Sequence, residues 1–176
     1  MFRIQHLLAA IALVLMAPVA AANAPGITPG ITPEMAEAWN ATEINWRDIK
    51  SGILEAATTK KTAIMVFHAP WCSACKTYRA VFKDKDIIEA SKDFVMILID
   101  GDADKMANGA FSPDGTYVPR TLFLNPDGDV LTGLVGKDPK YPHTIDIEKP
   151  DELLALMRKA KAGAAPASAP AGEGRT

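Results

Sequence analysis

The feature that most constrains this chain is its pair of cysteines, Cys72 and Cys75, which directly follow an apolar run at residues 62–67. The run has the length of a buried strand. A tight turn from that strand into a helix would place Cys72 in the first helical turn, where free N–H groups and the helix dipole favour an anion. Such a cysteine has a lowered pKa, and its thiolate attacks disulfides. Cys75 lies one turn further, within reach of Cys72, so the spacing supplies a nucleophile and its resolving partner.

Two other interpretations of the cysteine pair have less support. A structural disulfide across so short a loop would remove little entropy from the unfolded chain. A zinc site would need two more ligands, and His68 and His143 are the only histidines beyond residue 22. We therefore expect redox chemistry and no metal site.

A calcium loop is also disfavoured. Asp100, Asp102 and Asp104 alternate as calcium ligands do, but Lys105 and Phe111 replace the glycine and the glutamate that such a loop requires. We interpret residues 101–117 as a long, acidic, solvated loop.

The first 22 residues have the pattern of a secretory signal peptide. Arg3 precedes an apolar stretch at residues 7–16, and small residues follow at 20–22. The alternative, a membrane anchor, would need about 20 apolar residues. We expect cleavage and no stable membrane span, with a periplasmic or secreted protein in a compartment where disulfides persist.

The remaining composition is that of one globular domain with flexible ends. Hydrophobic residues make up 48% and charged residues 23%. The formal net charge of −2, without a dense Lys/Arg cluster, argues against nucleic acid as a partner. Turn-forming residues predict a linker at 23–40, with a helical turn at 34–40. An Ala/Pro/Gly composition predicts a disordered tail at 162–176. The domain is expected at 41–161.

Strand and helix patterns alternate through the first half of this domain, which indicates parallel strands joined by right-handed crossovers. Two later segments predict an antiparallel hairpin around an Asp-Gly turn, and Pro150 predicts the start of a last helix. The expected strands are residues 44–46, 62–67, 94–100, 120–125 and 129–135, and the expected helix carrying the cysteines is residues 72–82.

Residues 71–76, after a buried strand, resemble the active site of the thioredoxin superfamily. Residues 111–120 and 122–128 resemble the endoplasmic-reticulum thioredoxin-like proteins of the anterior gradient family. The resemblance spans about residues 46–160. It implies an α/β thioredoxin fold, with a central mixed sheet of four to five strands flanked by helices on both faces.

The resemblance also implies roles for residues around the cysteines. Pro119 would be the cis-proline that faces the cysteine pair, and the backbone of Val118 would pair with an extended substrate segment. The spacing alone leaves cis and trans equally open. Trp71 would shield the disulfide, whereas Tyr117 and Arg120 are interpreted either as substrate contacts or as surface packing.

One departure from thioredoxin concerns proton transfer. Val66 and Met96 occupy the positions where thioredoxin carries a buried acid and its lysine partner. His68, at the end of the same strand, is therefore a candidate for proton transfer, with a partly buried structural histidine as the alternative.

These patterns predict an exported thiol–disulfide oxidoreductase. Cys72 and Cys75 would exchange disulfides with protein thiols, no dissociable cofactor would be needed, and a redox partner would reset the pair. The alternative is a client-binding or chaperone-like module with little turnover, since the resemblance extends to relatives that lack a complete cysteine pair.

Overall fold

The computed structural model describes residues 30–164. Its strands are β1 (Trp46–Arg47), β2 (Ala63–His68), β3 (Val95–Asp100) and β4 (Arg120–Leu124). They form a four-stranded sheet in the order β1-β3-β2-β4, in which β4 alone runs antiparallel to its neighbour. The predicted α/β fold with a mixed sheet is confirmed.

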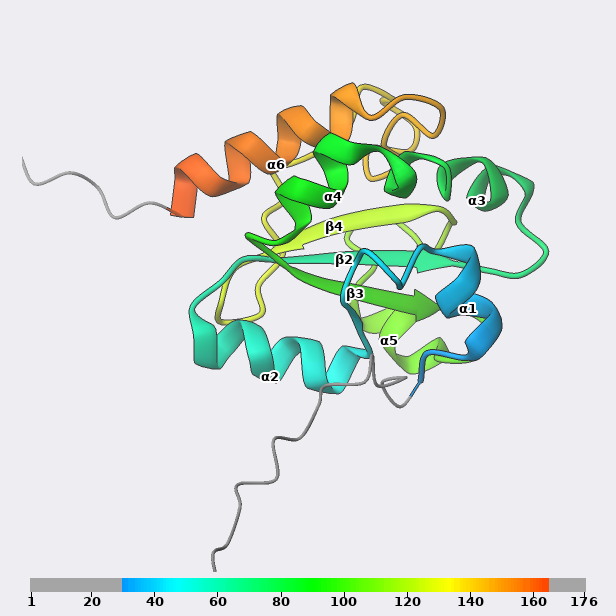
Figure 1. Cartoon of the computed structure of the whole chain (residues 1–176), viewed down its shortest axis with the longest axis horizontal. Helices are drawn as coiled ribbons and strands as arrows, with labels where there is room; N and C mark the ends of the chain where they lie inside the picture. The colour runs from blue at the N-terminus through cyan, green and yellow to red at the C-terminus, as the bar shows by residue number, and fades with distance from the viewer. Residues whose placement is uncertain (1–29, 165–176) are drawn as a thin grey trace, which may run out of the picture.

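Helices cover both faces of the sheet (Figure 1). Buried residues of α1, α3, α4 and α6 pack on one face, and those of α2 and α5 pack on the other. The helices are α1 (Pro33–Ala38), α2 (Ile49–Thr59), α3 (Ser73–Tyr78), α4 (Lys85–Ser91), α5 (Lys105–Ala110) and α6 (Asp151–Ala164), with a short 3₁₀ helix at Val81–Lys83.

Strand β2 lies in the middle of this arrangement, which explains its uninterrupted apolar sequence. Val66 pairs with Leu98 of β3 on one side and with Thr121 of β4 on the other. All six residues of β2 are buried. Because alternate side chains of a strand point to opposite faces, β2 contributes to the packing of both helical layers.

Aspartates begin three of the helices. Asp48, Asp84 and Asp104 accept hydrogen bonds from backbone N–H groups in the first turns of α2, α4 and α5. A side-chain oxygen at this position satisfies N–H groups that have no partner within the helix. The helix predicted after Asp48 is confirmed, whereas α5 corrects the expectation that residues 101–117 form only a loop.

The structure also corrects the predicted boundaries. Ile31, Met35 and Trp39 belong to the buried core, so residues 31–40 are part of the domain and the linker prediction is wrong there. The helical turn predicted at 34–40 is confirmed by α1, but fewer than two turns of helix gave no sign that it packs on the core. Helix α6 continues to residue 164, three residues beyond the predicted end of the domain. The predicted signal peptide, residues 23–29 and residues 165–176 lie outside the described part of the chain.

Two predicted elements are shorter than expected. The helix carrying the cysteines ends at Tyr78 and gives way to the 3₁₀ helix. The strand predicted at 129–135 is reduced to a single bridge between Val130 and Leu124. No helix within residues 30–164 is long and apolar enough to cross a membrane.

Removal of the Trp39 side chain tests whether α1 is part of the domain. The ring is fully buried against the rings of Tyr78 and Phe82. We expect Trp39→Ala to lower the free energy of unfolding by about 3–5 kcal/mol, as for other large aromatic side chains removed from a core. Urea denaturation measures this change.

The matched control is Leu54→Ala, which truncates a side chain that is 63% exposed on α2. We expect a change within about 0.5 kcal/mol for it. A loss below about 1 kcal/mol in Trp39→Ala would mean that α1 contributes little to the core.

Candidate active site

Cys72 and Cys75 form a disulfide at the carboxyl end of β2, with their Cα atoms 5.2 Å apart. The chain turns sharply after β2, and Cys72 becomes the N-cap of α3. The Cys75 backbone N–H donates to Cys72 Sγ at 3.0 Å. This donor favours negative charge on Cys72 when the disulfide is reduced, as the sequence predicted.

The two sulfurs differ in burial. Cys72 retains 4% of its surface, whereas Cys75 retains none. Only Cys72 thus has exposed surface, which fits the predicted order of nucleophile and resolving cysteine.

Trp71 is 70% exposed beside the disulfide, and its position is fixed by one hydrogen bond. Its indole N–H donates to Asp102 Oδ2 at 2.6 Å. Asp100 Oδ1 in turn accepts from the backbone N–H groups of Asp102 and Ala103 at 2.9 and 3.2 Å. Asp100, the last residue of β3, thus orders the loop that carries Asp102, the partner of Trp71.

The peptide bond between Val118 and Pro119 is cis. The Val118 carbonyl oxygen lies 3.6 Å from Cys72 Sγ. The fold therefore brings the loop before β4 directly against the disulfide, although 46 residues separate Val118 from Cys72.

Side chains distant in sequence hold this loop. Tyr117 Oη donates to Asp114 Oδ2 and accepts from the His143 backbone N–H at 2.9 Å. His143 Nδ1 lies 2.9 Å from Asp114 Oδ1, and Thr144 Oγ1 donates to the Pro119 carbonyl at 2.8 Å. Burial and the hydrogen bond to Asp114 raise the pKa of Tyr117, so its hydroxyl stays protonated. The sequence analysis missed Asp114, His143 and Thr144 because no local pattern links them.

Arg120 is fully buried at the start of β4. Its guanidinium lies 4.2 Å from the centre of the Phe67 ring and donates to the Tyr117 carbonyl at 2.9 Å and to Asn108 Oδ1 at 2.8 Å. Burial lowers the pKa of Arg120. The interpretation of Arg120 as a surface contact for substrate is therefore wrong, and its role is internal.

His68 is buried at the end of β2, with 2% of its surface exposed. Its ring centre is 5.2 Å from that of Trp39, and neither ring nitrogen has a hydrogen-bond partner within residues 30–164. Burial lowers the pKa of His68 below its ordinary value of 6.5, and the neighbouring charge of Asp100 only partly opposes this. His68 is therefore neutral at physiological pH.

The positions of the absent acid and lysine are apolar and buried in the structure. Val66 is fully buried and Met96 is 2% exposed. Met96 pairs with Ile64 across β3 and β2. His68 lies two residues after Val66 on the same face of β2, toward the layer that contains α3.

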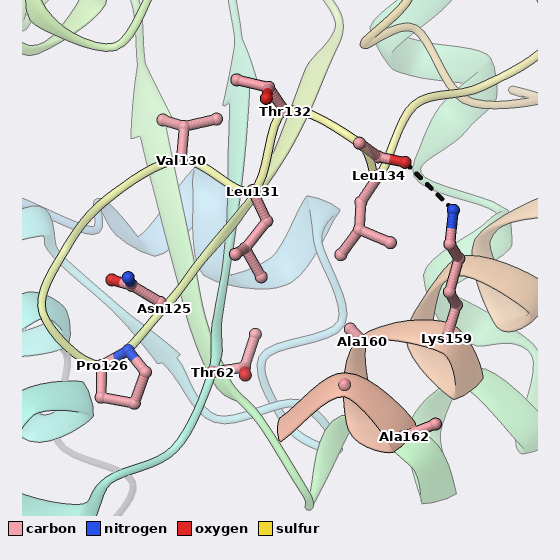
Figure 2. Close-up of a pocket in the computed structure, with 12 residues that line it drawn as sticks. Thr62, Asn125, Pro126, Val130, Leu131, Thr132, Leu134, Lys159, Ala160 and Ala162 are labelled. Atoms are coloured by element: carbon pink, nitrogen blue, oxygen red, sulfur yellow. Dashed lines mark hydrogen bonds between the residues drawn. The ribbon is translucent and has the colours of Figure 1, made fainter. Parts of the chain in front are cut away.

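The cavity in Figure 2 lies away from the disulfide. It has a volume of about 870 Å³ and is bounded by the turn after β4 and the end of α6. Thr62, which precedes β2, lines it, whereas the disulfide follows the other end of β2. Lys159 Nζ donates to the Gly133 carbonyl at 3.2 Å along its rim. Within the described chain, no group of three or more His, Cys, Asp or Glu side chains is arranged to hold a metal ion.

Comparisons with solved structures agree with the topology. The chain aligns with a thioredoxin from Thermus thermophilus with a TM-score of 0.56 at 15% identity, over 70% of this chain and 91% of that one. It aligns with a disulphide isomerase from Xylella fastidiosa Temecula1 with a TM-score of 0.51 at 19% identity, over 76% of this chain and 97% of that one. These alignments confirm the thioredoxin fold.

Comparisons of sequence are more specific. Residues 45–126 match the model of a thioredoxin-like family. Anterior gradient protein 3 of Mus musculus is 30% identical over 122 residues, which cover 67% of this chain and 72% of that protein. The anterior gradient protein 2 homolog of Homo sapiens is 24% identical over 76% of this chain and 73% of that protein. The chain therefore belongs to the anterior gradient family of thioredoxin-like proteins.

Proposed function

We propose that this protein is an exported thiol–disulfide oxidoreductase that acts on protein substrates. The observation that carries the proposal is the disulfide between Cys72, which keeps 4% of its surface exposed, and Cys75, which is fully buried. Export is supported by the signal-peptide pattern of the first 22 residues.

In the reducing direction, the Cys72 thiolate attacks one sulfur of a substrate disulfide. A bond forms between Cys72 and that sulfur, and the other substrate sulfur leaves as a thiolate. The Cys75 thiolate then attacks Cys72 Sγ, which forms the internal disulfide and releases the second substrate thiol. Two electrons pass to the substrate, and a redox partner restores the dithiol. The reverse sequence oxidises a substrate.

The substrate segment would bind along the loop that faces the disulfide. The Val118 carbonyl next to Cys72 is placed to accept a hydrogen bond from an extended peptide, as in the addition of a strand. Trp71, exposed on the other side of the nucleophile, offers an apolar surface to the same segment.

His68 is the proposed proton acceptor for Cys75. Cys75 must lose its proton before it can attack, and the positions of the missing acid and lysine hold Val66 and Met96. A buried neutral imidazole whose nitrogens have no hydrogen-bond partner within residues 30–164 can take that proton. His68 and α3 lie on the same side of β2, because His68 packs against Trp39 of the layer to which Cys75 belongs.

Serine variants of the two cysteines test the assignment of roles. We expect Cys75→Ser to accumulate disulfide-linked adducts with protein clients, because Cys72 can still attack but nothing resolves the mixed disulfide. Cys72→Ser should form none. Non-reducing gels of the purified variants incubated with oxidised insulin or another disulfide-containing protein measure the adducts.

The double variant Cys72→Ser/Cys75→Ser is the control for adventitious cross-links. Client binding without any adduct in Cys75→Ser, and no insulin reduction by the wild type with dithiothreitol as donor, would favour the client-binding module instead.

His68→Gln tests the proton acceptor. The reduced protein should release two equivalents of thionitrobenzoate from dithiobis(nitrobenzoate), the first on attack by Cys72 and the second on resolution by Cys75. We expect the variant to slow the second phase by about 10²-fold at pH 7, the lower range for a general base. Stopped-flow absorbance measures both phases.

The pH profile distinguishes this role from packing. Because the pKa of His68 is lowered from 6.5, the wild-type second phase should stay level from about pH 6.5 upward. In the variant the rate should rise about tenfold per pH unit, with the thiolate fraction of Cys75. The first phase is the internal control, and parallel second-phase profiles in the two proteins would exclude His68 as the acceptor.

A further inference from the structure

Two loops far apart in sequence meet over the cis peptide bond. One, residues 111–119, precedes β4, and the other, residues 136–148, follows the single bridge after β4. The backbone N–H of Thr121 in β4 also donates to the His143 carbonyl at 2.8 Å. The second loop therefore lies beside the first along the outer side of β4.

Side chains join the loops on both sides of Val118. Before it, Tyr117 is held through its hydroxyl by Asp114 and by the His143 backbone N–H. After it, the Pro119 carbonyl is held by the hydroxyl of Thr144. Val118, the residue whose carbonyl lies against Cys72, is thus fixed by its two neighbours.

The pair of Asp114 and His143 closes this arrangement. Asp114 uses one carboxylate oxygen for Tyr117 Oη and the other for His143 Nδ1. His143 is 4% exposed, while the Asp114 side chain is 23% exposed. A carboxylate that accepts from two groups of different loops restricts both, and charge-assisted hydrogen bonds of this kind are among the stronger ones in proteins.

We propose that Asp114, Tyr117, His143 and Thr144 are positioning residues for substrate recognition. They hold the Val118 backbone in the one orientation that can pair with an extended peptide beside Cys72. The proposal rests on the proposed function, since it takes the substrate to be a disulfide within an extended chain. It predicts that the network affects the recognition of peptide disulfides and leaves the reactivity of Cys72 unchanged.

The network contributes less to the core than to the loop. Tyr117 and Thr144 are only half-buried, and β4 is held independently of them by its pairing with β2. Removal of one hydroxyl should therefore loosen the position of Val118 without unfolding the domain.

Two near-isosteric variants test this. Tyr117→Phe removes the hydroxyl that joins Asp114 and His143, and Thr144→Val removes the donor to the Pro119 carbonyl. For each we expect kcat/KM with an extended peptide disulfide to fall about tenfold, mainly through KM, as for the loss of a well-placed hydrogen bond. The rate with hydroxyethyl disulfide, which has no backbone to pair, should stay within about twofold, as should alkylation of Cys72 by iodoacetamide.

Tyr141→Phe is the matched control. Tyr141 packs edge-on against the Tyr117 ring at 4.9 Å, and its hydroxyl makes no hydrogen bond within residues 30–164. We expect it to match the wild type with both substrates. Thermal unfolding of all three variants checks that the fold is intact.

The outcomes separate the network from the redox function. Equal losses with the peptide and the small disulfide, or no loss with either, would overturn the positioning role. Absence of turnover in the wild type would overturn the oxidoreductase proposal alone. In that case, nuclear magnetic resonance titration with a peptide whose cysteines are serines decides the matter. If Tyr117→Phe binds this peptide about tenfold more weakly than the wild type, the positioning role is supported. If the two proteins bind it equally, or if the wild type does not bind it detectably, the positioning role is contradicted.

Discussion

The complete burial of β2 is the constraint on which the site depends. A strand covered on both faces and paired on both edges cannot shift, because a slip by one residue would turn each side chain to the opposite face. Its last residue, His68, and the turn that follows are therefore fixed in space. The antiparallel pairing of β4 with the same strand brings the start of β4, and with it Pro119, to the same end of the sheet. The cysteines and the cis-proline face one another because the cysteines follow β2 directly and Pro119 precedes the strand that pairs with β2.

Burial also separates the tasks of the two sulfurs. Cys72 caps α3 and keeps 4% of its surface exposed, whereas Cys75 is fully buried. A buried thiol is costly to ionise, since burial disfavours the charged form. In the proposed mechanism, resolution by Cys75 needs a proton acceptor. Val66 and Met96 are apolar, and His68, which packs against Trp39 of the same layer, is the proposed acceptor.

Much of this arrangement follows from local sequence. The apolar run of β2, the aspartate before α2 and the cysteine spacing are each encoded within a few neighbouring residues, so the sheet and the disulfide were predictable. Short elements with weak sequence patterns could not be predicted in this way. The six residues of α5 show no apolar stripe, although Asp104 at its N-cap is a signal that could have predicted the helix. The strand expected at 129–135 does not form. This segment contains polar and glycine residues, and its only β-bridge to β4 in the described structure is at Val130.

The environment of the cis-proline was unpredictable for a different reason. Asp114 and His143 contact each other across 29 residues of sequence, and neither lies in a local motif that predicts this contact. Arg120 looked like a surface residue because arginine is rarely buried, yet the Phe67 ring and three oxygen atoms satisfy most of its guanidinium.

The disulfide depends on local sequence and the proline loop on long-range contacts, so mutations can alter one without the other. The chemistry of the sulfurs is held by a tight turn and one short helix, whereas the position of Val118 is held by long-range hydrogen bonds between loops. Loss of a cysteine would leave that loop network in place, and loss of the network would leave the disulfide intact. Under the proposed function, recognition of an extended chain and exchange of its disulfides would therefore be separable properties of one surface. This separation gives a physical route between an oxidoreductase and a client-binding module on the same fold.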